Sequence, residues 1–175
     1  GAVGIGADTR VVAYDDQGGA MAARLWWLLQ YLGHDPSKAH VLGENFSAWQ
    51  EAGLPVTADE PSPAPAVFEA KPQPQLLADV DEVKRKRGRA GVTLIDSRDP
   101  KRYRGEVEPL DRAAGHIPGA INRFWGDGRR ADGTWKSADE QRERFADLPR
   151  GDELIVYCGS GVTATPNVLA LREAG

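Results

Sequence analysis

Cysteine and histidine are scarce in this sequence, with 1 Cys and 3 His among 175 residues. A single Cys excludes an internal disulfide and a cysteine-cluster metal site. The histidines, His34, His40 and His116, lack the close spacing of metal ligands. We therefore expect no metal and no cofactor. Cys158 is left as a candidate reagent rather than a structural cross-link.

Long apolar runs and an excess of positive charge are also missing. The densest apolar stretch, residues 25–29, is far shorter than the roughly 18 residues of a membrane span. The 26 Asp and Glu outnumber the 22 Lys and Arg, so nothing global favours nucleic acid or an anionic membrane. The one basic run, residues 84–89, is typical of a solvated helix end. We expect neither nucleic acid nor a membrane as a partner.

The overall composition is that of a globular protein. Hydrophobic residues make up 41% and charged residues 27% of the chain, an ordinary balance for a packed domain. The first residues have neither the charged segment nor the long apolar segment of a signal peptide. We therefore expect a cytoplasmic location.

Proline marks the predicted domain organisation. Six of the 12 prolines fall between positions 55 and 74, in a stretch without hydrophobic periodicity. Such a stretch is typical of a semi-extended linker. We predict a linker over residues 58–75, which separates a segment at 1–57 from a segment at 76–175.

Strands alternate with helices in both segments, which predicts an α/β fold with small parallel sheets flanked by helices. In the first segment we expect strands at 10–14 and 40–42 and helices at 20–32 and 46–52. In the second we expect helices at 80–86 and 137–146, strands at 92–96 and 153–157, a polar loop at 97–114, and a helix from Pro166 with Thr165 as its N-cap.

The two segments also align with each other. A shift of 143 positions places residues 11–15 on residues 154–158, Gly18 on Gly161 and Leu28 on Leu171. This predicts a duplicated α/β domain. The first copy has no counterpart of residues 72–149, and the second stops where the first continues, so we expect both copies to be incomplete.

The surroundings of Cys158 favour a reactive thiol. The residue ends a predicted buried strand, and a loop with two glycines leads from it into a helix. Ligands bind at such strand ends in open α/β sheets, and the loop N–H groups and helix N-terminus attract anions. This setting favours the thiolate form of a thiol. The alternative is a buried, inert Cys.

Three motifs resemble a known family. Cys158-Gly159-Ser160-Gly161-Val162-Thr163-Ala164 resembles the active-site loop of tandem-domain rhodaneses, most of all the mercaptopyruvate sulfurtransferase form. Residues 115–120, Gly-His-Ile-Pro-Gly-Ala, resemble a second rhodanese signature, and residues 96–98 and 102–105 resemble a strand and loop of the catalytic domain. The resemblance implies tandem rhodanese-like domains: a partial, inactive N-terminal domain at 1–57, with Asp15 in place of a catalytic Cys, and a catalytic domain at 76–175 that lacks its last strand and helix.

The resemblance further implies sulfur transfer. The Cys158 thiolate would take sulfur from thiosulfate or 3-mercaptopyruvate and form a persulfide. Cyanide or a thiol such as thioredoxin would then accept the sulfur. Arg102, and less clearly Arg104, would bind the anionic donor. The loop N–H groups would stabilise the anionic sulfur; these belong to Gly159, Gly161, Val162 and Thr163.

Ser160 favours 3-mercaptopyruvate as the donor, because in the mercaptopyruvate enzymes the matching serine acts with a His and an Asp. Neither His34 nor His40 matches the position of that His. His116 lies in a motif that is typical of a structural turn, so we do not expect it to act as a base.

Two other functions remain as alternatives. A Cys-loop phosphatase or arsenate reductase would need an Arg six positions after the Cys, but position 164 is Ala. A catalytically impaired rhodanese-fold binding or regulatory module would keep the fold without turnover. Persulfide formation on Cys158 separates this module from the enzyme.

Overall fold

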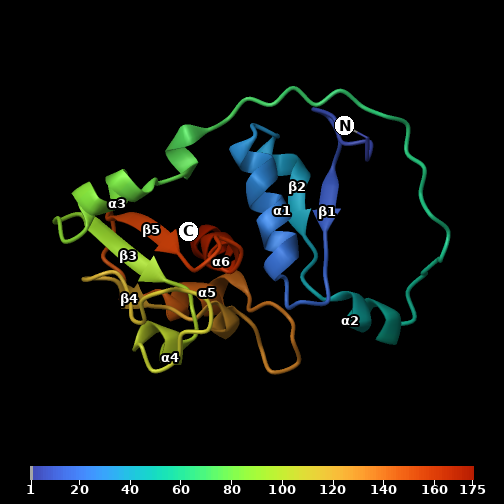
Figure 1. Ribbon diagram of the computed structural model, residues 1–175. Coiled ribbons are helices and arrows are strands. Elements are labelled where there is room, and N and C mark those ends of the chain that lie inside the picture. The colour runs from blue at the N-terminus through green and yellow to red at the C-terminus, as the bar shows by residue number, and fades with distance from the viewer. Residues whose placement is uncertain (1) are drawn as a thin grey trace. The chain divides into compact units, whose positions relative to one another are not determined.

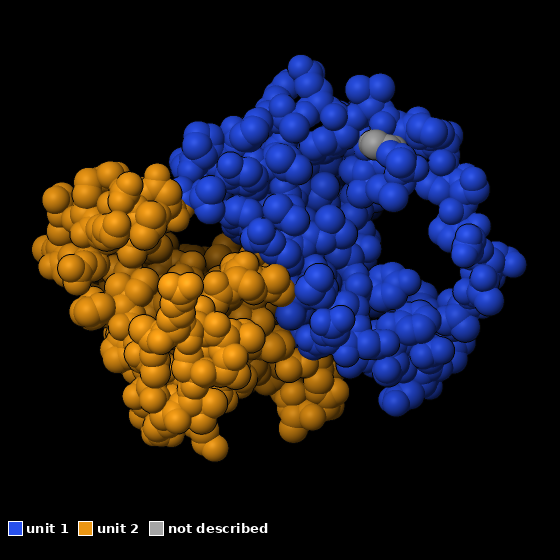
Figure 2. Space-filling model, in the orientation of Figure 1, with its two compact units in different colours: residues 1–77 blue, residues 78–175 orange. Residues whose placement is uncertain are grey.

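The computed structural model describes residues 2–175. The chain divides into two compact units, residues 1–77 and residues 78–175 (Figure 2). Each unit has its own parallel sheet (Figure 1). The α/β class with small parallel sheets flanked by helices is therefore confirmed.

Unit 1, residues 1–77, is built on a two-stranded parallel sheet. Val11 of β1 lies opposite Ala39 of β2, and α1 connects the two strands and packs on them (Figure 1). The helix buries a face of small and large apolar side chains that includes Ala23, Trp26 and Leu29. The elements of this unit are β1 (Val11–Ala13), α1 (Ala20–Tyr31), β2 (Ala39–Val41) and α2 (Phe46–Glu51), with 3₁₀ turns at Pro36–Lys38 and Pro74–Leu76.

Gly33 ends α1 and lets a distant segment approach. Its φ of +84° is a left-handed conformation, and a Cβ at this position would lie 2.6 Å from the Lys71 carbonyl oxygen, so only glycine fits. The Lys71 N–H donates to the Leu32 carbonyl at 2.8 Å, and the Gln73 N–H donates to the Tyr31 carbonyl at 2.7 Å. The last part of the predicted linker is therefore hydrogen-bonded to the end of α1.

Unit 2, residues 78–175, carries a three-stranded parallel sheet in the order β4-β3-β5 (Figure 1). Leu94, Ala120 and Ile155 form its buried cluster, and Val83 of α3 packs against them. The helix α6 contacts both α5 and β5. The elements of this unit are α3 (Val80–Lys86), β3 (Val92–Asp96), α4 (Pro100–Tyr103), β4 (Ile121–Asn122), α5 (Ala138–Arg144), β5 (Glu153–Tyr157) and α6 (Thr165–Ala174), with a 3₁₀ turn at Trp125–Gly128.

Two local predictions were wrong. The predicted loop at 97–114 contains α4, which begins because the Asp99 carboxylate accepts the Lys101 N–H at 2.8 Å and Pro100 occupies the first turn. Thr165 is not the N-cap of α6 but its first residue, since Ala164 holds the cap position. The Thr165 hydroxyl instead donates to the Val162 carbonyl at 2.7 Å.

Among residues 2–175, every helix is too short or too polar to cross a membrane. Within the same residues, no group of three or more His, Cys, Asp or Glu side chains could hold a metal ion.

Candidate active site

The strand ends of unit 2 bring the predicted motifs together. Asp96 at the end of β3 lies opposite Tyr157 at the end of β5, and the Ser97 N–H donates to the Tyr157 carbonyl at 2.9 Å. Cys158 follows Tyr157 directly and is half-buried. The loops that leave these two parallel strands therefore start side by side at one edge of the sheet, where α/β proteins bind ligands.

Cys158 lies at the start of a loop whose backbone turns toward its sulfur. The Gly161 N–H donates to the Cys158 Sγ at 3.1 Å. Gly161 can do so because its φ is +78°, a conformation that residues with a Cβ rarely adopt. A backbone N–H aimed at sulfur stabilises negative charge there. The side chain of Ser160, by contrast, is exposed at the tip of the loop.

The loop from Cys158 to Ala164, called the Cys loop below, leads into the ten-residue helix α6. The partial positive charge of the helix N-terminus is therefore directed at this loop. Asn167 in its first turn is fully buried, and its Nδ2 donates to the Ser97 Oγ at 2.8 Å and to the Arg123 carbonyl at 2.6 Å. Its Oδ1 accepts from Arg144 at 2.8 Å. These bonds tie the start of α6 to the ends of β3 and β4. Sequence reasoning missed Asn167, because a polar residue in a helix carries no signal of its burial.

Arg102 of α4 is brought to the Cys loop. A Cβ placed on Gly159 would lie 3.7 Å from both terminal nitrogens of the Arg102 guanidinium. An arginine fork in this position can bind the carboxylate or sulfonate end of a donor beside the thiol. The guanidinium therefore lies within van der Waals reach of the loop at position 159.

Glu108 holds the Arg102 guanidinium in place. Its side chain is 5% exposed and accepts from Arg102 Nη2 at 2.6 Å and Nε at 3.3 Å. The hydrogen bond from Arg102, followed by the one from the Asp111 N–H, lowers the pKa of the Glu108 carboxyl to about 2. Glu108 is therefore ionised throughout the neutral range. The sequence offered one weak signal for it, a carboxylate six positions after an arginine.

A second arginine, Arg98, belongs to the same ionic cluster, because it also binds Glu108. It is 7% exposed and bonds to Asp96 through Nη2 at 2.7 Å, to Glu108 at 3.2 Å and to the Gly115 carbonyl at 2.6 Å. Because the side chains of Arg98 and Asp96 are both buried, their ion pair has a structural role. The bond from Arg98 to the Gly115 carbonyl connects the end of β3 to the loop before Ile117.

Arg104 takes a different position from Arg102. Its side chain is half exposed, and its guanidinium pairs with the Glu106 carboxylate at 2.6 Å. Arg102 is the arginine that the structure places against the Cys loop, and the predicted role of Arg104 in donor binding stays a prediction.

His116 is part of a turn. Its Nδ1 donates to the Tyr103 carbonyl at 2.7 Å, which requires the proton on that nitrogen, and its ring stacks on Tyr103 with centroids 3.8 Å apart. The next N–H, of Ile117, donates to the Tyr157 hydroxyl at 3.1 Å. Burial raises the pKa of the Tyr157 phenol, so it stays neutral at pH 7.

The matching loop of unit 1 is filled by its own carboxylate. Asp15, which aligns with Cys158, accepts backbone N–H groups from Gln17, Gly19 and Ala22, each at 2.7 Å. These three N–H groups surround a carboxylate, just as the N–H groups of the Cys loop are expected to surround a bound anion. In unit 1 the anion is the side chain of Asp15 itself.

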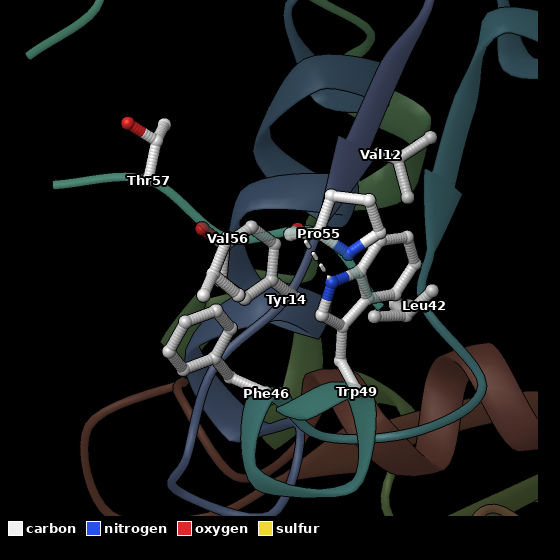
Figure 3. A pocket seen from close by; sticks show the side chains of 8 residues that line it. All are labelled: Val12, Tyr14, Leu42, Phe46, Trp49, Pro55, Val56 and Thr57. Carbon is white, nitrogen blue, oxygen red and sulfur yellow. Dashed lines mark hydrogen bonds between the residues drawn. The ribbon is translucent and has the colours of Figure 1, made fainter. Parts of the chain in front are cut away.

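Unit 1 also holds an apolar pocket of about 390 Å³. Figure 3 shows the Tyr14 and Phe46 rings on one side, stacked at 5.5 Å, and the Trp49 indole on the other, donating to the Pro55 carbonyl at 3.0 Å. Carbon surfaces dominate it, and neither a thiol nor a charged side chain lines it. The groups around the thiol, Cys158, Arg102 and Glu108, all belong to unit 2.

Fold and site together define a class: a parallel α/β domain with a cysteine at a strand end, in a glycine loop that opens into a helix. The Rhodanese-like domain family matches residues 79–175. The chain therefore belongs to the rhodanese-like domain family.

Known relatives resemble the whole chain. It is 44% identical over 175 residues to the probable 3-mercaptopyruvate sulfurtransferase of Pseudomonas aeruginosa, and 37% identical over 182 residues to the thiosulfate sulfurtransferase of Mus musculus. These matches cover 98% and 100% of this chain and 61% of each relative.

A solved structure shows the same arrangement. The crystal structure of SseA from Escherichia coli, described as a 3-mercaptopyruvate sulfotransferase, superposes with a TM-score of 0.84 at 32% identity. The match covers 98% of this chain and 64% of SseA. The chain thus spans somewhat under two thirds of the length of these relatives.

Proposed function

We propose that this protein is a sulfurtransferase that moves a sulfane sulfur from a small anionic donor to an acceptor through a persulfide on Cys158. One observation carries the proposal: the sulfur of Cys158 accepts a backbone N–H within its loop, and Arg102 lies against that loop at Gly159. A nucleophile and an anion-binding group are thereby adjacent. The names of the relatives support the same chemistry.

The first half of the reaction is a nucleophilic displacement at sulfur. The Cys158 thiolate attacks the outer sulfur of thiosulfate, the S–S bond of the donor breaks, and sulfite leaves with the bonding electrons. With 3-mercaptopyruvate the C–S bond breaks instead, and pyruvate leaves after protonation of its enolate. In both cases the product is a Cys158 persulfide, whose negative charge the loop N–H groups stabilise.

The second half passes the sulfur on. Cyanide would attack the outer persulfide sulfur to give thiocyanate, or a thiol such as thioredoxin would accept the sulfur as its own persulfide. Either acceptor restores the Cys158 thiolate. A reducing cytoplasm, our proposed location, keeps both the enzyme thiol and the acceptor thiols reduced. Between the two donors, Ser160 in the loop favours 3-mercaptopyruvate.

The proposal is tested by the intact mass of the protein after brief incubation with thiosulfate or with 3-mercaptopyruvate. We expect a gain of one sulfur atom that dithiothreitol removes. The gain should be absent in Cys158→Ser, whose fold is checked by circular dichroism. A folded wild-type protein that gains no sulfur from either donor would refute the enzyme and favour the binding module.

A further inference from the structure

Arg102 is bound by two carboxylates of very different character. Glu108 is buried and accepts five hydrogen bonds: two from Arg102, one from Arg98 Nη1, and two from the N–H groups of Leu110 and Asp111. The carboxylate of Asp111 approaches the same Nη2 at 3.2 Å, but it is 51% exposed. Arg102 thus has one permanent counter-ion and one that water already reaches.

The Asp111 carboxylate contacts a guanidinium nitrogen that an anionic donor would also use. Arg102 Nη2, which it contacts, is one of the two nitrogens that lie 3.7 Å from the Cβ position of Gly159. A donor anion bound to this fork beside the thiol would compete with Asp111 for the same guanidinium. Two carboxylates on one guanidinium also leave that corner of the site with no positive charge in excess.

Leaving Arg102 is easier for Asp111 than for Glu108. Asp111 lies in an exposed loop, and the neighbouring Leu110 side chain is 78% exposed. Its second arginine contact, to Arg98, is 3.9 Å long. An exposed ion pair of this kind contributes only about 0.2–1 kcal/mol, whereas the buried Glu108 could not leave without stranding a charge.

We propose that Asp111 is an internal competitor that the anionic donor displaces from Arg102, and so sets how tightly this site takes anions. The proposal rests on the proposed sulfurtransferase function for the identity of the donor, but the competition itself concerns any small anion that reaches Cys158. Glu108 stays in place and keeps the guanidinium oriented, while the side chain of Asp111 turns to solvent.

The test uses the single thiol of the chain. Second-order rate constants for alkylation of Cys158 are measured with iodoacetate, an anion, and with iodoacetamide, its neutral analogue. Their ratio reports anion binding at the site and cancels changes in the thiol itself. We expect Asp111→Asn to raise the iodoacetate-to-iodoacetamide ratio about 1.4- to fivefold, the range that an exposed ion pair corresponds to.

Three further variants separate displacement from a general effect of charge. Asp139→Asn removes the same charge from an exposed carboxylate that pairs with Arg142 on α5, and should leave the ratio unchanged. Asp111→Glu keeps the charge and should behave as wild type. In an Arg102→Gln background, Asp111→Asn should have no effect on the ratio, because the group that the two anions compete for is gone.

The donor kinetics give a second readout. With thiosulfate or 3-mercaptopyruvate, Asp111→Asn should lower the donor KM for persulfide formation by a similar factor and leave the maximal rate constant unchanged. An unchanged alkylation ratio in Asp111→Asn, or an equal rise in the Arg102→Gln background, overturns the proposal. A raised ratio in a protein that forms no persulfide supports the competition and refutes the sulfurtransferase function, so the two failures are distinguishable.

Discussion

At the scale of single residues, the site depends on how one guanidinium is held. Glu108 fixes the orientation of Arg102 beside the loop by accepting hydrogen bonds from its Nε and Nη2. A planar fork with five donors can satisfy a buried carboxylate and a ligand at once, which an ammonium group cannot do with the same geometry. The orientation of Arg102 is therefore as much a property of Glu108 as of Arg102 itself.

The first prediction concerns the acid stability of the protein. Folding lowers the pKa of Glu108 from its usual 4.5 to about 2, so the native state favours the ionised form. The resulting stabilisation is complete above about pH 4.5 and is lost as the pH falls toward 2. We expect Glu108→Gln to lose less stability than wild type between pH 5 and pH 2.5, measured as the shift of the urea midpoint. Parallel midpoint curves for the two proteins would contradict the assigned role of Glu108.

At the scale of elements, the same strand–loop–helix arrangement occurs twice, with a different residue directly after the strand in each copy. In unit 2 the loop between β5 and α6 presents a thiol. In unit 1 the loop between β1 and α1 closes around the Asp15 carboxylate. Both use glycines with positive φ, Gly161 in the one and Gly19 in the other. In both copies the loop N–H groups form an anion-binding site. The residue after the strand decides whether a side chain of the protein fills that site or leaves it to a ligand.

A stability prediction follows for unit 1. Asp15→Ala removes the acceptor of three N–H groups at the start of α1, and should lower the free energy of unfolding by about 1–3 kcal/mol. Asp16→Ala is the matched control, because the Asp16 carboxylate makes only longer bonds, of 3.2 and 3.3 Å, to Ser47. The measurement is thermal or urea unfolding followed by tryptophan fluorescence. Equal destabilisation by the two variants would refute the role of Asp15 as the anion that these N–H groups bind.

At the scale of the whole molecule, the two compact units have separate cores. The buried cluster of Leu94, Ala120 and Ile155 lies in unit 2, and so do Cys158, Arg102 and Glu108. Unit 1 has its own buried side chains on α1. The parts that form the thiol site therefore belong to one compact unit.

The third prediction is that unit 2 folds and forms the thiol site without unit 1. Residues 78–175 produced alone should unfold in one cooperative transition, and Cys158 should react with iodoacetamide within about twofold of its rate in the full chain. The measurements are urea unfolding by circular dichroism and alkylation followed by mass. A fragment without a cooperative transition, or with a thiol as fast as a denatured one, would show that unit 1 is needed to form the site.

The sequence by itself determined the regular elements and the place of the single thiol directly after a strand. Strands at 92–96 and 153–157 were predicted with their observed bounds, and the helix predicted at 137–146 is present and begins with a capping box of Ser137 and Glu140. These are local signals: β-branched runs, caps and glycines act within a few neighbours along the chain. The loop motif after Tyr157 is local in the same sense.

Only the tertiary structure decided which charged groups surround that thiol. Arg102 and Arg104 are two positions apart in sequence, yet one lies against Gly159 and the other pairs with Glu106. Asn167 and Glu108 look like surface residues in sequence and are buried in the fold. Burial and ion pairing join residues far apart in the chain, so no local pattern encodes them.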